Sequence, residues 1–417
     1  MTLTEELNWR GFLNQTTFAD NGTKELDNSS MEFYWGVDPS SDSMTIGNLA
    51  AAMLVMHFMR HGHRATLLVG GATGLIGDPD GKKQERDLLS FEEIQANKVK
   101  IVSQYKNLFQ GQDFNLVDNY DWFKNMNYLA FLRDIGKHVS VGQMLGREFV
   151  RSRIGDEGSG ISYAEFSYVL IQAYDYLRLF EDKGVTLQLC GSDQWGNSIA
   201  GVDLIRRKTG KEAHVYSTPL VVNKQTGQKF GKSEDGAIWL DKEKTTPTQF
   251  YQFWINIDDE SVEDYLKIFS LLNKEDIEST VKAHNENPGA RIGQQKLAEA
   301  VTSIVHGKEL TDRAQSITQI LIGKSTLADI SDSAVLEDLR KEIAHVNTSD
   351  SAELAQVLVD CGLASSKTEA RQFIAGNAIS INNVKVNKDN LEASDFINGK
   401  LLLRRGKAFK DSALVEL

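Results

Sequence analysis

The chain has 417 residues, of which 41% are hydrophobic and 25% charged, and its formal net charge is −12. This composition is ordinary for a globular protein and argues against a collagen-like, disordered or membrane-spanning chain, because no apolar run approaches the roughly 20 residues of a membrane helix. The length exceeds what one hydrophobic core fills, so we expect two or three domains. The acidic balance argues against unspecific coating of nucleic acid but is compatible with RNA docking on a local patch.

Cysteine and histidine usage predicts neither disulfides nor a metal centre. Cys190 and Cys361 lie far apart in the sequence, which fits a reducing compartment. His57 and His61 are four residues apart but lack the HExxH pattern of a zinc site. The first residues, MTLTEELNWRGF, have no basic start and no apolar core of a secretory signal. We therefore expect a cytoplasmic protein without a membrane partner.

The first 222 residues alternate short apolar runs with longer amphipathic runs. Strands are expected at 33–37, 65–69, 114–117, 186–190 and 219–222, and helices at 47–60, 91–109, 121–135, 162–180 and 194–208. This alternation predicts an α/β fold with a Rossmann-like parallel sheet and helices on both faces. Ligands bind such sheets at the carboxyl ends of the strands, where the strand order reverses.

The remainder of the chain changes character. Residues 246 to about 321 show a helical pattern, and residues after 351 predict two helices followed by short strands. Residues 351–417 carry 9 Lys+Arg and 8 Asp+Glu, so the net charge is +1 there and −13 in the preceding residues. We therefore expect a Rossmann-like domain at 1–240, an α-helical domain at 241–325, a linker at 326–350 and a small α+β domain at 351–417.

A strand-to-helix connection near the amino terminus could hold an anion. The predicted strand ends at Val37 and leads into Asp38, and the helix begins near Gly47. A helix start offers free N–H groups and the positive end of the helix dipole, and a glycine lets a ligand approach the backbone. A plain helix start explains the same residues.

The segment GGATGLIGDPDGKKQER resembles a phosphate-binding loop but lacks the Walker spacing. Three residues rather than four separate Gly77 from Gly81, and Lys83 rather than Ser or Thr follows Lys82. The segment is either a flexible surface loop or an arm that carries Lys82 and Arg86 toward a phosphate.

Two further patterns place polar groups together. Lys229 and Lys232 flank a glycine in a polar stretch, which suits a polyanion or a solvated turn. Tyr168, Gln172 and Asp175 are spaced so that they share one face of an otherwise apolar helix. Such a trio forms either a satisfied core network or a ligand site.

The order and spacing of these motifs closely resemble those of the bacterial tyrosyl-tRNA synthetase family, over nearly the whole chain. The matching segments are Tyr34-x-Gly36-x-Asp38-Pro39, GGATGLIGDPxGKKxER, Asn119-Tyr120-Asp121-Trp122, Tyr168-xxx-Gln172-xx-Asp175, Gln188-xx-Gly191-Ser-Asp193-Gln194-Trp195-Gly196-Asn197 and Lys229-Phe230-Gly231-Lys232-Ser233. The resemblance implies that 241–325 recognises the anticodon and that 351–417 is an S4-like RNA-binding domain.

The resemblance also implies a class I ligase that acts in two steps. The carboxylate of L-tyrosine attacks the α-phosphate of ATP, which binds with Mg²⁺, and the tyrosyl group then passes from the adenylate to tRNA-Tyr. Such catalysis needs positioning and charge stabilisation rather than an enzyme nucleophile. The expected partners are L-tyrosine, ATP, tRNA-Tyr and a second copy of the chain, with no metal site formed by protein alone.

Residue roles follow from the same resemblance. Tyr34 and Asp175 are expected to bond the phenol of the substrate. The α-ammonium group is expected at Tyr168, Gln172 and Asp78, and the pocket between tyrosine and ribose at Gln188, Asp193 and Gln194. Asp38 and Gly47 are expected near the adenylate, and the pyrophosphate is expected to be stabilised by Lys82, Arg86, Lys229 and Lys232.

One departure from the family concerns the ATP signature. The family's His-Ile-Gly-His is replaced by Thr45-Ile-Gly-Asn48. Asn48 offers an amide N–H where a histidine ring N–H would lie, whereas Thr45 is shorter and cannot be cationic. Trp35 is also bulkier than the family leads us to expect near the ribose. An active tyrosine–tRNA ligase with a retuned ATP site and a degenerate tyrosine- or RNA-binding relative both remain open, while a tryptophan-specific enzyme is disfavoured by the Tyr34–Asp175 pair.

Overall fold

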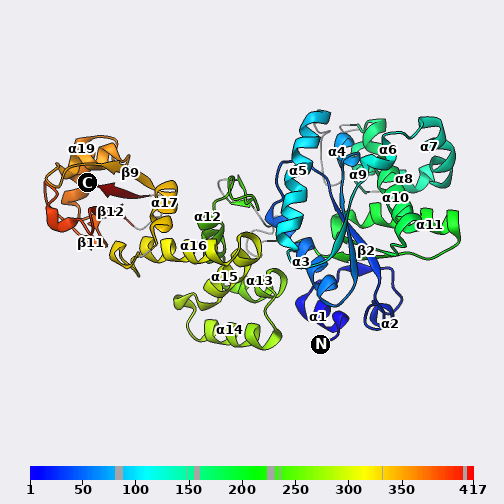
Figure 1. Ribbon diagram of the computed structural model, residues 1–417, viewed down its shortest axis with the longest axis horizontal. Helices are drawn as coiled ribbons and strands as arrows, with labels where there is room; N and C mark the ends of the chain where they lie inside the picture. The colour runs from blue at the N-terminus through cyan, green and yellow to red at the C-terminus, as the bar shows by residue number, and fades with distance from the viewer. Residues whose placement is uncertain are drawn as a thin grey trace. The chain divides into compact units, whose positions relative to one another are not determined.

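The computed structural model describes residues 1–79, 88–146, 148–154, 160–222, 230, 232–233, 236–330, 332–406 and 411–417. The chain divides into two compact units (Figure 1). The first comprises Met1–Lys244 and Ile257–Gly293, and the second comprises Thr245–Asn256 and Gln294–Leu417. Within the described ranges, no helix is long and apolar enough to cross a membrane.

The first unit is built on a six-stranded sheet with the order β1-β6-β5-β2-β3-β4. All neighbouring strands are parallel except β1, which runs antiparallel to β6. The strands are β1 (Gln15–Thr16), β2 (Glu32–Val37), β3 (Arg64–Val69), β4 (Phe114–Asp118), β5 (Leu187–Gly191) and β6 (His214–Thr218). The strand order reverses between β2 and β5, so the predicted Rossmann-like sheet has its ligand-binding edge there.

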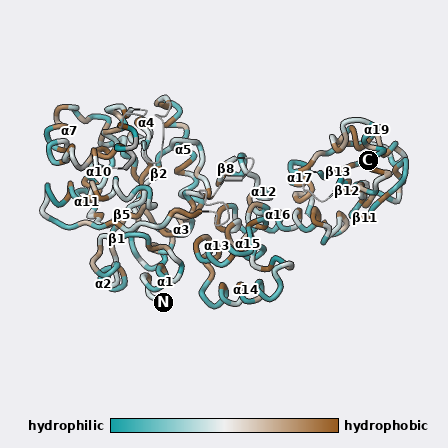
Figure 2. The backbone as a smooth tube through the Cα atoms, turned by 180° about the vertical axis from the view of Figure 1, so that it is seen from behind, coloured by the Kyte–Doolittle hydropathy of each residue, from teal (hydrophilic) through white to brown (hydrophobic). Residues whose placement is uncertain are grey.

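Helices cover both faces of this sheet because successive residues of a strand point to opposite faces. Phe33 packs against Phe58 of α3 (Ile46–Arg60), on the face that α5 (Phe91–Leu108) also covers. Tyr34 points the other way and packs against Tyr176 of α10 (Tyr163–Lys183), which lies beside α11 (Trp195–Thr209). Hydrophobic residues dominate α3 in Figure 2, and most of this helix is buried.

Residues 257–293 join the first unit through the amino-terminal helix. Arg10, at the end of α1 (Leu3–Arg10), is 3% exposed and donates hydrogen bonds to the carbonyl oxygens of Lys267, Ser270 and Leu272. These carbonyls lie at and after the end of α13 (Val262–Phe269), where a helix has no internal donors for them. A single guanidinium therefore fastens α13 to the amino terminus.

The remaining elements of the first unit are short or peripheral. They are α2 (Thr23–Leu26), α4 (Thr73–Ile76), α6 (Tyr120–Phe123), α7 (Tyr128–Asp134), η1 (Gly136–His138), α8 (Val141–Leu145), α9 (Glu148–Ile154), η2 (Ser192–Gln194), β7 (Lys232–Ser233), β8 (Gly236–Ala237), η3 (Asp259–Ser261), α14 (Lys274–Glu286) and η4 (Pro288–Ala290).

Two sequence predictions in this unit were wrong. The strand expected at 219–222 is instead β6, at residues 214–218. Pro219 has no N–H group to donate to a neighbouring strand, so the pairing stops before it. The helix expected at 121–135 is divided into α6 and α7, because Asn127 accepts hydrogen bonds from the N–H groups of Leu129 and Ala130 and thereby starts a new helix.

The second unit combines helices with a small five-stranded sheet of order β11-β10-β12-β13-β9. The helices are α12 (Pro247–Ile255), α15 (Ile292–His306), α16 (Lys308–Leu321), η5 (Leu327–Asp329), α17 (Ser333–Glu342), α18 (Leu354–Asp360), α19 (Lys367–Ala375) and η6 (Ala393–Asp395). The strands are β9 (Ala344–Asn347), β10 (Ile379–Ile381), β11 (Val384–Lys385), β12 (Lys400–Arg405) and β13 (Ser412–Glu416).

The linker expected at 326–350 is not a free connection. It contains α17 and β9, and β9 pairs in parallel with β13 at the edge of the small sheet. Arg340 of α17 also binds Glu416 through two hydrogen bonds of 2.9 Å. Three of the four residues of β9 are exposed, and only Val346 is partly buried. The helical stretch 241–325 is likewise divided between the two units.

Candidate active site

A cavity of about 310 Å³ opens where the carboxyl ends of β2 and β5 meet the start of α3. Its lining includes many residues that the sequence singled out: Tyr34, Asp38, Thr45, Gly47, Asn48, Asp78, Tyr168, Gln172, Asp175, Gln188, Asp193 and Gln194. Lys82, Arg86 and Lys229 lie outside the described residues. The backbone of Lys232 lies in β7, and its side chain is not described.

Buried polar atoms without partners mark one part of the cavity. The hydroxyl of Tyr34, Oε1 of Gln172 and Oε1 of Gln188 are buried and have no hydrogen-bond partner among the residues that the structure describes. Buried polar groups are normally paired, because leaving one unpaired costs about 1–3 kcal/mol. Three such atoms around one cavity indicate a polar ligand that supplies their partners.

Asp175 lies in the same part of the cavity and is 2% exposed. One carboxylate oxygen accepts from Trp122 Nε1 at 2.8 Å and the other from Asn119 Nδ2 at 3.0 Å. Burial raises the pKa of Asp175 to about 8, although these two hydrogen bonds favour the charged form. The sequence motif contained Asn119 and Trp122 without revealing that both orient this carboxyl group.

We expect the contribution of Asp175 to folding stability to fall as the pH rises from about 4 to about 8. The unfolded chain releases this proton near the ordinary pKa of 3.8, whereas the folded chain keeps it up to about 8. Unfolding therefore releases a proton in this window, and a higher pH favours unfolding by about 1.4 kcal/mol per pH unit. Urea denaturation at pH about 5 and about 7 should show this slope in the wild type and its loss in Asp175→Asn; equal slopes would contradict the assignment.

The other α10 residues face the cavity as the helical spacing predicted. Tyr168 donates from its hydroxyl to Asp38 Oδ2 at 2.7 Å, and Thr73 donates to Asp38 Oδ1 at 2.5 Å. Asp38 follows β2, whereas Thr73 begins α4. The carboxylate of Asp38 therefore connects the end of the central strand to α10 and to the glycine-rich segment. The sequence did not indicate that Thr73 takes part in this connection.

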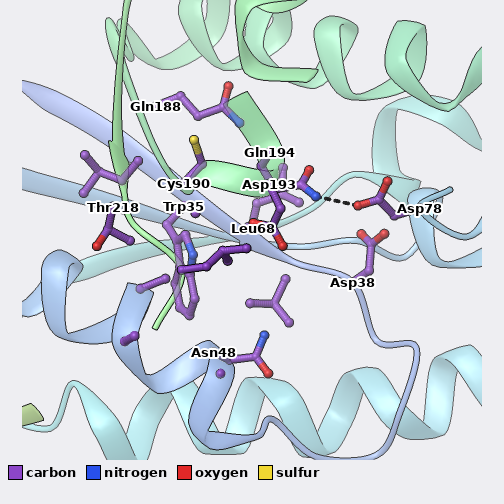
Figure 3. A pocket seen from close by; sticks show the side chains of 18 of the residues that line it. Trp35, Asp38, Asn48, Leu68, Asp78, Gln188, Cys190, Asp193, Gln194 and Thr218 are labelled. Atoms are coloured by element: carbon purple, nitrogen blue, oxygen red, sulfur yellow. Dashed lines mark hydrogen bonds between the residues drawn. The ribbon is translucent and has the colours of Figure 1, made fainter. Parts of the chain in front are cut away.

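A second polar link crosses the cavity. Gln194 donates from Nε2 to Asp78 Oδ2 at 2.5 Å (Figure 3), and its Oε1 accepts from Asn197 at 3.2 Å. Asp38 and Asp78 both line the cavity, and both are labelled in Figure 3. This part of the site thus presents two acidic groups and their amide partners to a ligand.

The start of α3 presents an amide group to the cavity. The N–H and the hydroxyl of Thr45 both lie within hydrogen-bond distance of Asn48 Oδ1, at 2.9 and 3.2 Å. A backbone N–H can only donate, so the oxygen of Asn48 must face Thr45 and its NH₂ group points away, toward the cavity in Figure 3. The hydroxyl of Thr45 is therefore engaged within the helix start rather than extended toward a ligand.

Trp35 is a further lining residue that lies outside the predicted set of site residues. It is 4% exposed and packs against Tyr105 and Phe109 of the α5 region. Gly47, Ala50 and Ala51 line the same cavity. The aromatic side chains of Tyr105 and Phe109 therefore accommodate the bulky indole at this position.

In the part of the chain that the structure describes, no group of three or more His, Cys, Asp or Glu side chains could hold a metal ion. What the described residues offer is a partly buried pocket with hydroxyl, amide and carboxyl groups, next to a helix start suited to an anion.

Family models match both parts of the chain. The model described as tRNA synthetases class I (W and Y) matches residues 26–322, and the model described as the tyrosine–tRNA ligase SYY-like C-terminal domain matches residues 335–410.

Individual proteins are similar over the full length. The chain is 43% identical to a tyrosine–tRNA ligase of Bacillus caldotenax over 98% of both chains. It is 41% identical to a protein named tyrosine–tRNA ligase 2 of Bacillus cereus over all of both chains. Among solved structures, a C-terminally truncated mitochondrial tyrosyl-tRNA synthetase of Aspergillus nidulans aligns with a TM-score of 0.69 and 30% identity, covering 76% of this chain and 93% of that one.

Proposed function

We propose the roles of this cavity from the premise that the chain belongs to the class I tRNA synthetases and, within them, to the tyrosine–tRNA ligases. Its activity is the ATP-dependent joining of L-tyrosine to tRNA-Tyr. In the first step the tyrosine carboxylate forms a bond to the α-phosphorus of ATP, and pyrophosphate leaves. In the second step a ribose hydroxyl of the tRNA takes the tyrosyl group, and AMP leaves.

The buried polar end of the cavity is proposed to bind the tyrosine side chain. Tyr34 and Asp175 would bond the phenolic hydroxyl, since each brings an unpartnered or partly used polar atom to the pocket. Gln188 lies opposite Tyr34 in the paired strands β5 and β2 and would line the same pocket. Gln172, Tyr168 and Asp78 would hold the α-ammonium group, which needs acceptors rather than donors.

The start of α3 is proposed to bind the nucleotide. Gly47 carries no side chain there, and the N–H groups and dipole of the helix start favour phosphate. Asn48 would donate from its NH₂ group, while Asp38, Asp193 and Gln194 would line the adenylate. Mg²⁺ is proposed to enter as part of the substrate, bound to ATP.

The cationic side chains act on the leaving pyrophosphate in this proposal. Lys82, Arg86, Lys229 and Lys232 would supply positive charge as the bond to the α-phosphate breaks. Their assignment rests on the family motifs alone. The protein would otherwise contribute positioning, and no side chain of the cavity needs to attack the substrate.

The observation that carries this proposal is the set of unpartnered buried atoms on Tyr34, Gln172 and Gln188. The test is tyrosine-dependent exchange of radioactive pyrophosphate into ATP. Exchange that requires tyrosine is the expected result. No exchange by a chain that still binds tyrosine would overturn the proposed roles of the nucleotide-binding residues.

No observation on the described residues favours the alternative of a degenerate tyrosine- or RNA-binding relative. A substitution at Thr45 tests how far the nucleotide site is weakened. Thr45→His should raise kcat of pyrophosphate exchange about five- to thirtyfold, because a cationic donor to a phosphate contributes about 1–2 kcal/mol more than a hydroxyl engaged elsewhere. The affinity for tyrosine should not change, since Thr45 lies at the start of α3. An unchanged kcat would mean that the threonine already suffices.

The partner surfaces are also proposals. Exposed apolar side chains gather in the segment 128–163 of the first unit, at Tyr128, Leu129, Val141, Leu145, Ile154 and Tyr163. Such a set is unusual for a free surface and fits contact with a second copy of the chain. Sedimentation velocity tests whether the chain is a dimer in solution.

The helices between 241 and 325 are proposed to recognise the anticodon, and residues 351–417 are proposed to bind the tRNA. The chain is proposed to act in the cytoplasm.

A further inference from the structure

The start of α3 is joined by backbone hydrogen bonds to the segment that follows the lysine motif. Ile46 donates its N–H to the carbonyl oxygen of Ile238 at 3.1 Å, and Leu240 donates to the carbonyl oxygen of Met44 at 2.9 Å. Thr45 and Trp239 face each other in this antiparallel bridge. The loop before α3 therefore forms one side of a two-stranded ladder.

The other side of this ladder leads directly to Lys232. Ala237, next to Ile238, pairs with Lys232 in the antiparallel strands β7 and β8. Two backbone pairings thus separate the start of α3 from Lys232. The start of α3 and the lysine motif, which are both proposed to bind ATP, are linked through residues 236–241. The position of one segment therefore constrains the position of the other.

A buried hydrogen-bond hub fixes this ladder to α5. The hydroxyl of Ser43, a residue that is 5% exposed, donates to the carbonyl oxygen of Met44 at 2.8 Å. Its oxygen accepts from the N–H of Asp241 at 3.1 Å and from Nε2 of Gln104 at 2.8 Å. Gln104 Oε1 in turn accepts from the N–H of Met44 at 2.8 Å.

The orientation of the Gln104 amide is set by its partners. The backbone N–H of Met44 can only donate, so it must face the amide oxygen. The hydrogen of the Ser43 hydroxyl is used on Met44, so the hydroxyl oxygen must face the amide nitrogen. Gln104 therefore uses both ends of its side chain on the loop before α3, and no other residue type of similar size reproduces this pair of contacts.

An outer ion-pair cluster supports the same loop more weakly. Asp42 pairs with Lys100 of α5 at 2.7 Å and with Lys244, and these lysines lower the pKa of Asp42 to about 2. The side chain of Lys100 is 52% exposed, and exposed ion pairs contribute little to stability. The buried hub of Ser43 and Gln104 is therefore the stronger constraint.

We propose that Gln104, acting through Ser43, is a positioning residue for the activation of tyrosine by ATP. It holds the start of α3 in register with the strand that continues to Lys232. The inference rests on the proposed nucleotide-binding role of α3 and the lysine motif. Because reactions that depend on positioning lose about a hundredfold in rate for displacements near 1 Å, a small shift of this ladder is enough to impair the reaction.

The test compares Gln104→Met with the wild type. Methionine fills a similar volume but makes neither hydrogen bond, so kcat/KM for ATP in pyrophosphate exchange should fall about ten- to a hundredfold. Equilibrium binding of tyrosine should change less than about twofold, since the phenol pocket lies on the opposite face of β2. Gln104→Glu should rescue part of the loss, because a carboxylate still accepts from the N–H of Met44.

Gln95→Met is the matched control, with the same substitution on the same helix at a residue that accepts from Lys98 rather than from the loop before α3. Amide hydrogen exchange gives a readout that does not depend on activity. The N–H groups of Ile46 and Leu240 should exchange faster in Gln104→Met than in the control.

The two readouts separate the inference from the function on which it rests. A wild type without pyrophosphate exchange would count against the proposed function. Unchanged protection of Ile46 and Leu240, or a kcat/KM for ATP equal to that of Gln95→Met, would overturn the positioning role of Gln104. Equal losses of tyrosine and ATP affinity would also overturn it, because they would indicate general destabilisation.

Discussion

Asp175→Ala is expected to erase the preference for tyrosine over phenylalanine. The carboxyl group is buried, and Asn119 and Trp122 orient it from two sides. Removing it leaves the buried phenolic hydroxyl without this partner, which costs about 1–3 kcal/mol. This corresponds to a loss in kcat/KM for tyrosine of about 5- to 150-fold. Phenylalanine has no hydroxyl to bond, so its kcat/KM should fall little, and the ratio between the two substrates collapses.

Pyrophosphate exchange with each amino acid measures this ratio. Asp182→Ala is a suitable control, because Asp182 lies on the same helix, pairs with Arg178 and has a side chain that is 48% exposed. Tyr34→Phe should reduce the same preference, since it removes the other group that faces the phenol. Undiminished discrimination in Asp175→Ala would mean that the phenol is recognised elsewhere.

Gly70→Ala is expected to lower kcat/KM for pyrophosphate exchange about a hundredfold, with a fall of only a few degrees in the thermal midpoint of unfolding. A Cβ atom at Gly70 would lie 2.0 Å from Asp38 Oδ1 and 2.3 Å from Thr73 Oγ1. Both distances are far shorter than a normal contact, so Asp38 must turn away and release Tyr168 and Thr73. The cost to folding is limited to the lost hydrogen bonds of these two buried hydroxyl groups, about 1–3 kcal/mol, because only the ends of side chains move. The site, in contrast, loses the carboxylate that connects its elements.

Gly136→Ala provides the comparison for this prediction. A Cβ atom at Gly136 would meet Leu132 at 3.5 Å, which is an ordinary contact. Its exchange activity and its thermal midpoint should both match the wild type. Full activity in Gly70→Ala would show that the position of Asp38 is unimportant for activation.

Local periodicity predicted the parts of the site that lie on single elements. Tyr168, Gln172 and Asp175 face one cavity because 3.6 residues per turn bring these positions to one side of α10. The end of β2 and the start of α3 were predicted to bind a ligand because parallel sheets place ligands at their carboxyl edge. These inferences needed no knowledge of contacts between distant segments.

The contacts that complete the site join residues that are far apart in the chain. Asn119 and Trp122 reach Asp175 across 56 and 53 positions, and Gln104 reaches Ser43 across 61. Spacing within one element carries no information about such pairs. The same limit applies to the stretch 326–350, because the pairing of β9 with β13 depends on residues about 70 positions away.

The amino-acid sequence alone was enough to establish the alternating α/β pattern, the helix face of α10 and the family to which the chain belongs. These properties depend on local periodicity and on the order of short motifs. The tertiary structure decided which polar groups remain unpaired, that burial raises the pKa of Asp175 to about 8, and that a hub on α5 holds the start of α3. Burial and pairing depend on segments that meet only when the chain folds, so no local pattern records them.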